Sequence, residues 1–253
     1  AVSFDVKPLR RAVEDSSGHG LVIVASGGSQ TAALLLSALH HATFGHPCRV
    51  VTPLVFRHDP ALARGNVWLL SAGGRNADIL GAADHAISAG ARSITALIAS
   101  LQTPLEAKLA AYGGARSYTY SLTSGSDGFL ATNSLWSMCL LMECAYQPDE
   151  SEKTYQDAVA ALEWAAGSVS RISDWSGTLV GLGDPDTLIG LQDLEMRATE
   201  AALAPVWVSD LRNLGHGRHY WFEAQRDRAR AIGLYTAAYS GLASRTLRLL
   251  GTV

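Results

Sequence analysis

The chain has 253 residues, of which 48% are hydrophobic and 17% charged, and its formal net charge is −3. This length suits one large or two modest domains with their own cores, and the near-neutral charge excludes a general attraction to nucleic acid or anionic membranes. Cys48, Cys139 and Cys144 have no CxxC spacing, so neither a disulfide framework nor a zinc site is indicated. Because the first twenty residues lack an apolar core, no secretory signal is predicted, and we expect a cytoplasmic protein.

The first half of the chain alternates short apolar runs with helical segments. Residues 21–25 form an unbroken apolar run of the length of a buried strand. We expect strands at 21–25, 49–54, 66–71, 93–99 and 115–120, and helices at 4–15, 31–40, 76–89, 104–112 and 129–146. This alternation predicts an α/β fold with a parallel sheet covered by helices on both faces. Polar residues within 129–146 favour a buried core or dimer helix over a membrane span.

The second half repeats the pattern on a smaller scale. Polar residues 147–152 indicate a domain boundary, and the strand, loop and helix at 178–203 repeat the arrangement at 21–41. Helices are expected at 154–169, 187–203 and 241–250, and extended segments at 178–182, 205–208 and 230–236. We therefore predict two tandem domains, 1–148 and 149–253, the second abbreviated.

Small polar loops follow two of the predicted strands. Ser26-Gly27-Gly28-Ser29 stands between a strand and a helix, where backbone N–H groups and the helix dipole attract anions. The loop matches neither a GxGxxG nor a GxxxxGK[ST] motif, and a structural turn without a ligand is the alternative. A second Ser- and Gly-rich loop lies at 71–76. Because ligands bind at the carboxyl ends of parallel strands, two such loops at one edge favour a site.

At these loops the chain resembles the SIS (sugar isomerase) domain family of phosphosugar-binding proteins, in particular double-domain members such as the isomerase half of glucosamine-6-phosphate synthases. Residues 25–29 match the first phosphosugar loop, 71–78 fall on an S-Q-S-G-E-T-A-D loop, and 128–133 fall on a G-V-A-S-T segment. The resemblance implies that a sugar phosphate is bound by Ser26, Gly28, Ser29, Gln30, Ser71, Gly73, Gly74, Asn76 and Thr132.

The resemblance continues in the second domain and implies catalytic residues there. Residues 181–184 match a G-R-G-D loop, 197–200 correspond to K-L-K-E, and 214–217 to L-K-H-G. It implies that Glu200 moves a proton between C1 and C2 and that His216 opens the ring, with Arg197 also among the catalytic residues. Isomerisation needs such a carboxylate and a group that titrates near neutrality. The alternatives are a solvated glutamate near a helix end and a turn histidine.

The chain also departs from the family pattern. Gly73, Arg75 and Asn76 stand where the second loop has Ser, Glu and Thr, so two hydroxyl donors are lost. Arg75 either binds an anion through two N–H groups or faces solvent at a helix start. The family's catalytic Lys lies near its C-terminus, whereas this sequence ends at Val253 and has no Lys after Lys153.

Two further patterns carry less weight. His216 and His219 have no third ligand at metal spacing, so no metal is expected. Residues 218–230 interleave Arg with aromatics, which suits either nucleic acid or a solvated or interface surface, and the acidic residues within the run favour the surface.

Together the patterns predict a sugar-phosphate isomerase-like protein that acts on an aldose, ketose or amino-sugar phosphate. The alternative is a non-catalytic module that senses a sugar phosphate or nucleotide sugar with the same loops. We expect no cofactor, no nucleic acid and no membrane partner. A homodimer is implied by the family, and a partner chain that completes the second domain is a further alternative.

Overall fold

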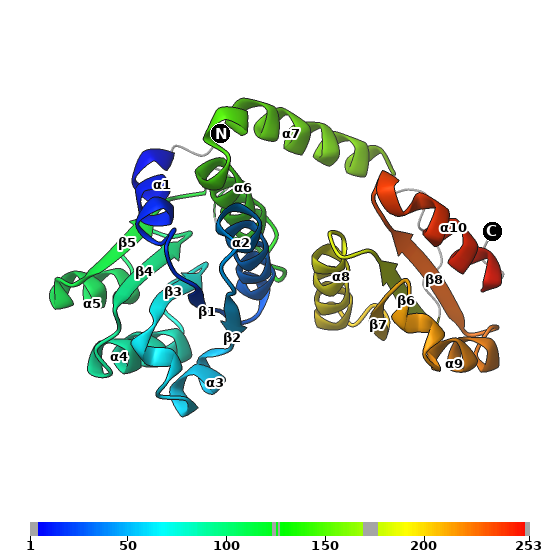
Figure 1. The fold of residues 1–253 in the computed structure, drawn as a ribbon, viewed down its shortest axis with the longest axis horizontal. Helices are drawn as coiled ribbons and strands as arrows, with labels where there is room; N and C mark the ends of the chain where they lie inside the picture. Colours follow the sequence, from blue (N-terminus) through cyan, green and yellow to red (C-terminus); the bar gives the residue numbers. More distant parts are fainter. Residues whose placement is uncertain (1–4, 123–124, 126, 169–176, 251–253) are drawn as a thin grey trace. The chain divides into compact units, whose positions relative to one another are not determined.

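Residues 5–122, 125, 127–168 and 177–250 are described by the computed structural model. The chain divides into two units, residues 1–164 and 165–253 (Figure 1). The sequence places this division at 148/149, ahead of α7 (Ser151–Ser168). The start of α7 is tied to the first unit, because Ser151 Oγ lies 3.3 Å from the Cys144 carbonyl oxygen.

The first unit is built on a five-stranded parallel sheet with the strand order β2-β1-β3-β4-β5. The strands are β1 (Leu21–Val24), β2 (Arg49–Val51), β3 (Asn66–Ser71), β4 (Ser93–Ile98) and β5 (Ala115–Thr119). In the middle of the sheet, Trp68 pairs with Ile23 on one side and with Thr95 on the other. All residues of β3 except Ser71 are buried, as expected of a strand covered on both faces. The predicted parallel α/β sheet is confirmed.

Helices cover both faces of this sheet (Figure 1). The first face and its core, which includes Trp68 and Leu97, pack against α1, α2 and α6. The opposite face, which includes Val67 and Leu69, packs against α3, α4 and α5. The helices are α1 (Val6–Asp15), α2 (Gly28–Phe44), α3 (Pro53–His58), α4 (Ala77–Ser88), α5 (Pro104–Tyr112) and α6 (Asn133–Tyr146).

Several predicted elements have different bounds in the structure, and the largest differences in the first unit are at 31–40, where α2 runs from Gly28 to Phe44, at 49–54 and at 129–146. The strand expected at 49–54 ends at Val51, because Thr52 accepts a hydrogen bond from the Val55 N–H group at 3.4 Å and caps α3. Pro53 then occupies the first turn of α3, where its missing N–H group costs nothing. The helix expected at 129–146 begins only at Asn133.

The second unit contains a three-stranded parallel sheet with the order β7-β6-β8. Its elements are β6 (Thr178–Gly183), α8 (Leu188–Glu200), β7 (Val206–Asp210), α9 (Arg218–Ala224), β8 (Ala229–Leu234) and α10 (Ser240–Leu249). Val180 and Leu182 of β6 form a buried core with Phe222 of α9 and Ala243 of α10. The second sheet is therefore abbreviated, as the sequence predicts.

Both sheets have a switch point, where the chain leaves a central strand first toward one side and then toward the other. In the first unit this point lies between β1 and β3, and in the second between β6 and β8. Ligands of open parallel sheets bind at the carboxyl ends of the strands beside such a point. No described helix is long and apolar enough to cross a membrane.

Candidate functional site

The turn after β1 presents an uncapped helix start. Gly27 adopts a positive φ of 54°, and α2 begins at Gly28 without a side-chain cap. Gln30 donates its backbone N–H group to the Gly27 carbonyl at 2.9 Å, which closes the turn. Ser26 is exposed and Ser29 is half-buried. The first N–H groups of α2 and these hydroxyls suit an anion.

The loop after β3 is held in a fixed shape by its own polar groups. Ser71 Oγ accepts a hydrogen bond from the Gly74 N–H group at 3.0 Å. Gly74 has a φ of 58°, and a Cβ there would lie 2.7 Å from Thr103 Oγ1. Asn76 Oδ1 accepts from the Asp78 N–H group at 2.7 Å and so caps α4. The Ser71 hydroxyl proton and the Asn76 amide protons are the donors left for a ligand. Arg75 is exposed.

These two loops lie at one edge of the sheet, because β1 and β3 are paired neighbours with parallel direction. The structure thus brings Ser26, Gly28, Ser29 and Gln30 to the same edge as the loop of residues 71–76.

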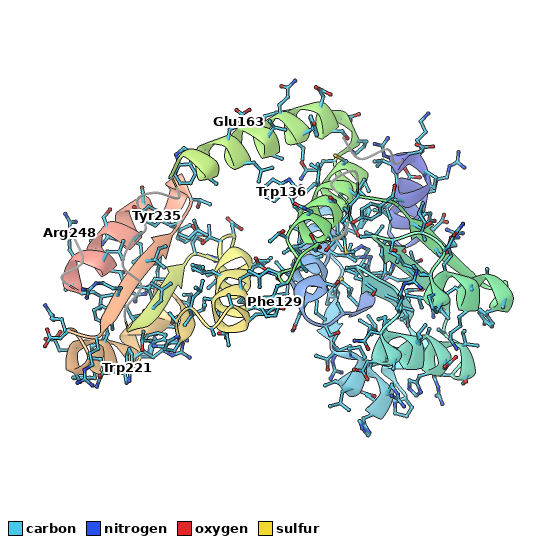
Figure 2. All side chains as sticks on the ribbon, turned by 180° about the vertical axis from the view of Figure 1, so that it is seen from behind. Phe129, Trp136, Glu163, Trp221, Tyr235 and Arg248 are labelled. Atoms are coloured by element: carbon cyan, nitrogen blue, oxygen red, sulfur yellow. The ribbon has the colours of Figure 1, made fainter. Side chains whose placement is uncertain are left out.

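The third predicted patch, before α6, is arranged differently. Thr132 is exposed and makes no capping hydrogen bond. Asp127 caps α6 instead: its carboxylate accepts from the Asn133 N–H group at 2.7 Å, from the Ser134 N–H group at 3.2 Å, and from the Ser134 hydroxyl. Phe129, which the sequence places in the helix, is 79% exposed on the preceding loop (Figure 2).

A pocket of about 470 Å³ opens at the carboxyl ends of β3, β4 and β5 beside the start of α6. Of the predicted binding residues, Gly73 lines it. Sequence reasoning missed its polar lining residues Ser100, Ser121, Asp127 and Ser134. Ser100 and Ser121 follow the ends of β4 and β5, so applying the carboxyl-end rule to every strand would have found them.

Tyr120 supports the wall of this pocket. Its side chain is buried, and its hydroxyl donates to the Ser134 carbonyl at 3.4 Å. Burial raises the pKa of Tyr120 well above its usual range, and the nearby Cys139 and Asp127 raise it further. Tyr120 therefore stays protonated and keeps donating to the first turn of α6.

In the second unit, Glu200 belongs to an ion triad on α8. Arg197 Nη1 lies 3.4 Å from Glu200 Oε2, and Arg197 Nη2 lies 3.2 Å from Asp193 Oδ1. The Arg197 side chain is only 13% exposed, whereas that of Glu200 is 40% exposed. Sequence reasoning missed Asp193, although its spacing of one helical turn from Arg197 is visible in the sequence.

Glu200 and His216 lie at opposite ends of β7 in one chain. Glu200 ends α8 near Pro205, whose carbonyl accepts from Leu179 at the start of β6 at 2.9 Å. His216 follows the other end of β7, beyond Leu211, which donates to the Gly183 carbonyl at 2.9 Å. His216 is exposed and lines a pocket of about 540 Å³ with Leu214, His219 and Tyr220.

Asp184 lies at the switch point of the small sheet and accepts hydrogen bonds from residues that follow both β6 and β8. Its carboxylate is only 1% exposed and accepts from the N–H groups of Asp186 and Thr187 at 3.0 and 3.1 Å. It also accepts from the N–H group and hydroxyl of Thr236 at 2.6 and 2.9 Å. Burial alone would raise the pKa of Asp184, but the hydrogen bonds from Thr236 and Thr187 outweigh it and hold the pKa below its usual value.

The Arg- and aromatic-rich run at 218–230 has a packing role at its start. Trp207 of β7 and Trp221 of α9 form an edge-to-face pair with ring centroids 5.5 Å apart (Trp221 in Figure 2). The Arg218 guanidinium lies 5.8 Å from the Trp207 ring and donates to the Val208 carbonyl at 3.1 Å. These contacts attach α9 to the edge strand β7. Among the described residues, no cluster of His, Cys, Asp or Glu could hold a metal ion.

Comparison with known proteins gives a fold but no sequence relative. No protein-family model matches the sequence, and no curated protein matches it significantly. Among solved structures, tagatose-6-phosphate ketose/aldose isomerase from Escherichia coli has a TM-score of 0.78 at 14% identity, over 96% of this chain and 71% of that chain. Glucosamine-6-phosphate deaminase from Thermotoga maritima has a TM-score of 0.77 at 14% identity, over 98% of this chain and 80% of that chain.

The C-terminal domain of glucosamine-fructose-6-phosphate aminotransferase from Francisella tularensis is also similar. Its TM-score is 0.74 at 12% identity, over 98% of this chain and 72% of that chain. The chain thus has an α/β SIS-like fold in which the second sheet is abbreviated.

Proposed function

We propose that the protein binds a sugar phosphate at the carboxyl edge of its five-stranded sheet and isomerises it, acting on an aldose, ketose or amino-sugar phosphate. The observation that carries the proposal is that the loops after β1 and β3 follow neighbouring parallel strands and that the second of them lines a pocket of about 470 Å³ through Gly73. The shared fold with sugar-phosphate isomerases supports the same substrate class.

The proposed binding residues divide by the chemistry that each offers. The uncapped start of α2, with Ser26, Gly28, Ser29 and Gln30, suits the phosphate, because N–H groups and the positive helix end converge there. The loop from Ser71 through Gly73 and Gly74 to Asn76 supplies the Ser71 hydroxyl and the Asn76 amide as further donors. Thr132 adds an exposed hydroxyl at the start of α6.

Catalysis is assigned to the second unit. Glu200 removes the C2 proton of the open-chain aldose and returns it to C1, and His216 moves a proton to the ring oxygen when the ring opens. Arg197 positions the Glu200 carboxylate through its 3.4 Å contact. Since Glu200 and His216 lie at opposite ends of β7, the proposal includes a homodimer in which different chains supply the two groups to one ligand.

The experiment is solvent deuterium exchange at C2, followed by NMR with a panel of hexose, hexosamine and pentose phosphates. We expect exchange with one class and none with Glu200→Gln, which keeps the shape of the side chain but cannot accept the proton. Glu195→Gln, another α8 carboxylate outside the described ion pairs, is the control and should exchange normally. Full exchange in Glu200→Gln would rule out its role as the base.

A second function, a non-catalytic sugar-phosphate sensor, is favoured by one specific observation. Asn76, which stands where the family has a hydroxyl donor, uses its side-chain oxygen to cap α4. A sensor would bind the sugar phosphate, measured by calorimetry, without any deuterium incorporation. The dimer is tested separately by sedimentation of the full chain.

A further inference from the structure

The pocket beside α6 is lined almost entirely by neutral groups. Its polar side chains are those of Ser100, Ser121, Ser134 and Asp127, and the remainder are glycine, alanine and leucine. Among the lining residues, all of which lie in the described part of the chain, Asp127 is the one with a formal charge. The pocket that the proposed function assigns to a sugar phosphate thus carries a negative charge, on Asp127.

The hydrogen bonds of Asp127 leave room for one more donor. A carboxylate has about four lone-pair positions. Three are taken by the N–H groups of Asn133 and Ser134 and by the Ser134 hydroxyl, and Ser134 N lies within reach of both oxygens at 3.3 and 3.2 Å. With three protons for four positions, a further donor from a ligand competes only with the long, shared contact of the Ser134 N–H group.

The charge of Asp127 is also only partly balanced. All three donors are neutral groups, and none of the ion pairs found among the described residues involves Asp127. The positive end of α6 offers roughly half an elementary charge. About half a negative charge is left facing a half-buried pocket, where it favours a cation.

The same carboxylate excludes a phosphate from the start of α6. A phosphate charge about 4 Å from a carboxylate is repelled by roughly 4 kcal/mol near a protein surface. The phosphate is therefore directed to the uncapped start of α2 and to the Ser71 hydroxyl and Asn76 amide of the neighbouring loop. The rest of the ligand then extends toward Ser100, Ser121 and Asp127.

We infer that Asp127 binds an ammonium group of the ligand, so that this pocket selects amine-bearing sugar phosphates over neutral ones. The inference rests on the proposed function, because it assigns the part of the ligand that follows the phosphate. Ser100 and Ser121 suit neutral hydroxyl groups, whereas Asp127 provides the charge that distinguishes an amine from a hydroxyl.

The test compares glucosamine 6-phosphate with glucose 6-phosphate, which differ only in the amine or hydroxyl at C2. Calorimetry on the full chain at pH 7 should give the amine an affinity about tenfold higher, in line with a charge-assisted hydrogen bond. In Asp127→Asn this preference should disappear, mainly through weaker binding of the amine. Asparagine keeps a carbonyl oxygen that can cap α6, so the fold is preserved.

Asp149→Asn is the matched control, because Asp149 is an exposed carboxylate of the same unit that does not line the pocket. It should keep the wild-type preference. Equal affinities of the wild type for both sugars, or an unchanged preference in Asp127→Asn, would overturn the assignment while leaving sugar-phosphate binding in place. Failure of both sugars and of the wider phosphate panel to bind would overturn the proposed function, and this inference with it. The wild-type comparison needs no variant, so it decides the point even if Asp127→Asn does not fold.

Discussion

Each of the two sheets has an aspartate at its carboxyl edge, and the two aspartates differ in what surrounds them. Asp184 is 1% exposed, and five donors from both sides of the switch point surround its carboxylate. Asp127 is half-buried, receives three donors, and borders a pocket of about 470 Å³. The same residue type thus fastens one sheet edge and is open to a ligand at the other. The number of donors and the degree of burial decide which role it has.

The largest expected effect comes from removing these two carboxylates in turn. Asp184→Ala removes the buried carboxylate that accepts from the N–H groups of Asp186 and Thr236 and from the hydroxyls of Thr187 and Thr236, so we expect a loss of about 3 kcal/mol in the stability of the second unit. Asp127→Ala removes a helix cap that water can replace in part, and should cost about 1 kcal/mol. Hydrogen–deuterium exchange resolved by peptide separates the two units.

An equal loss of stability in both variants would contradict this contrast. If Asp127→Ala destabilises its unit as much as Asp184→Ala does, then Asp127 has a structural role, and its assignment to the ligand loses support. Asp149→Ala, at an exposed position, serves as the reference and should change stability by less than about 0.5 kcal/mol.

The fold was largely predictable because its strands are unbroken apolar runs with clear ends. The strand at 66–71 and the helix at 104–112 have the predicted bounds, since Gly65 precedes the first and a Thr103–Pro104 helix start opens the second. The helix α3 was missed because a strand was predicted over residues 49–54, which include Pro53. In the structure Thr52 caps a helix, with Pro53 in its first turn. A proline after a threonine suits both, and tertiary packing decides between them.

The candidate site was predictable only in part. The loops after β1 and β3 were visible as small polar stretches after apolar runs, and β1–β3 pairing brings them to one edge. Asp127 was missed because nothing in its neighbourhood distinguishes it from a solvated loop carboxylate. Its role depends on donors that the fold brings to it. The separation of Glu200 from His216 follows from the direction of α8 and β7, which spacing along the chain does not reveal.

Two adjacent glycines in the β3–α4 loop differ in the space around them: Gly74 lies against Thr103, whereas Gly73 faces open space. Gly74→Ala places a Cβ at a φ of 58°, 2.7 Å from Thr103 Oγ1 and 2.9 Å from Thr103 Cβ. We expect a loss of about 2 kcal/mol and weaker sugar-phosphate binding, because the loop must move away from α5. Thermal unfolding and calorimetry measure the two effects.

Gly73→Ala is the matched control for that loss of stability, because nothing lies within 4 Å of a Cβ at this position. Its stability should stay within about 0.5 kcal/mol of wild type. A loop that tolerates both substitutions equally would show that the contact with Thr103 does not fix its shape.

The stability of the two units should also depend differently on pH. The effect of His40 on the first unit is the smallest change in stability that we predict. His40 is fully buried in the first unit, 2.8 Å from the Tyr146 hydroxyl and 2.8 Å from the His19 carbonyl oxygen. Burial lowers the pKa of His40, and the nearby His46 adds to this, against the His19 carbonyl, which raises it. The unfolded chain therefore takes up a proton at His40 more readily than the folded chain. The first unit should lose stability as the pH falls below about 6.5.

Asp184 acts at lower pH. Its pKa is lowered in the folded state, so the ionised carboxylate stabilises the second unit at every pH above the ordinary pKa of aspartate. This contribution is lost only as the pH falls through and below about 4. Between pH 7 and 5 the first unit should therefore weaken before the second, with each kcal/mol lowering the unfolding temperature by about 2–4 °C. His40→Gln, which can still donate and accept hydrogen bonds, should flatten this decline, whereas His58→Gln, at an exposed position on α3, should leave it unchanged. A decline between pH 7 and 5 that persists in His40→Gln would place the acid sensitivity of the first unit on another group.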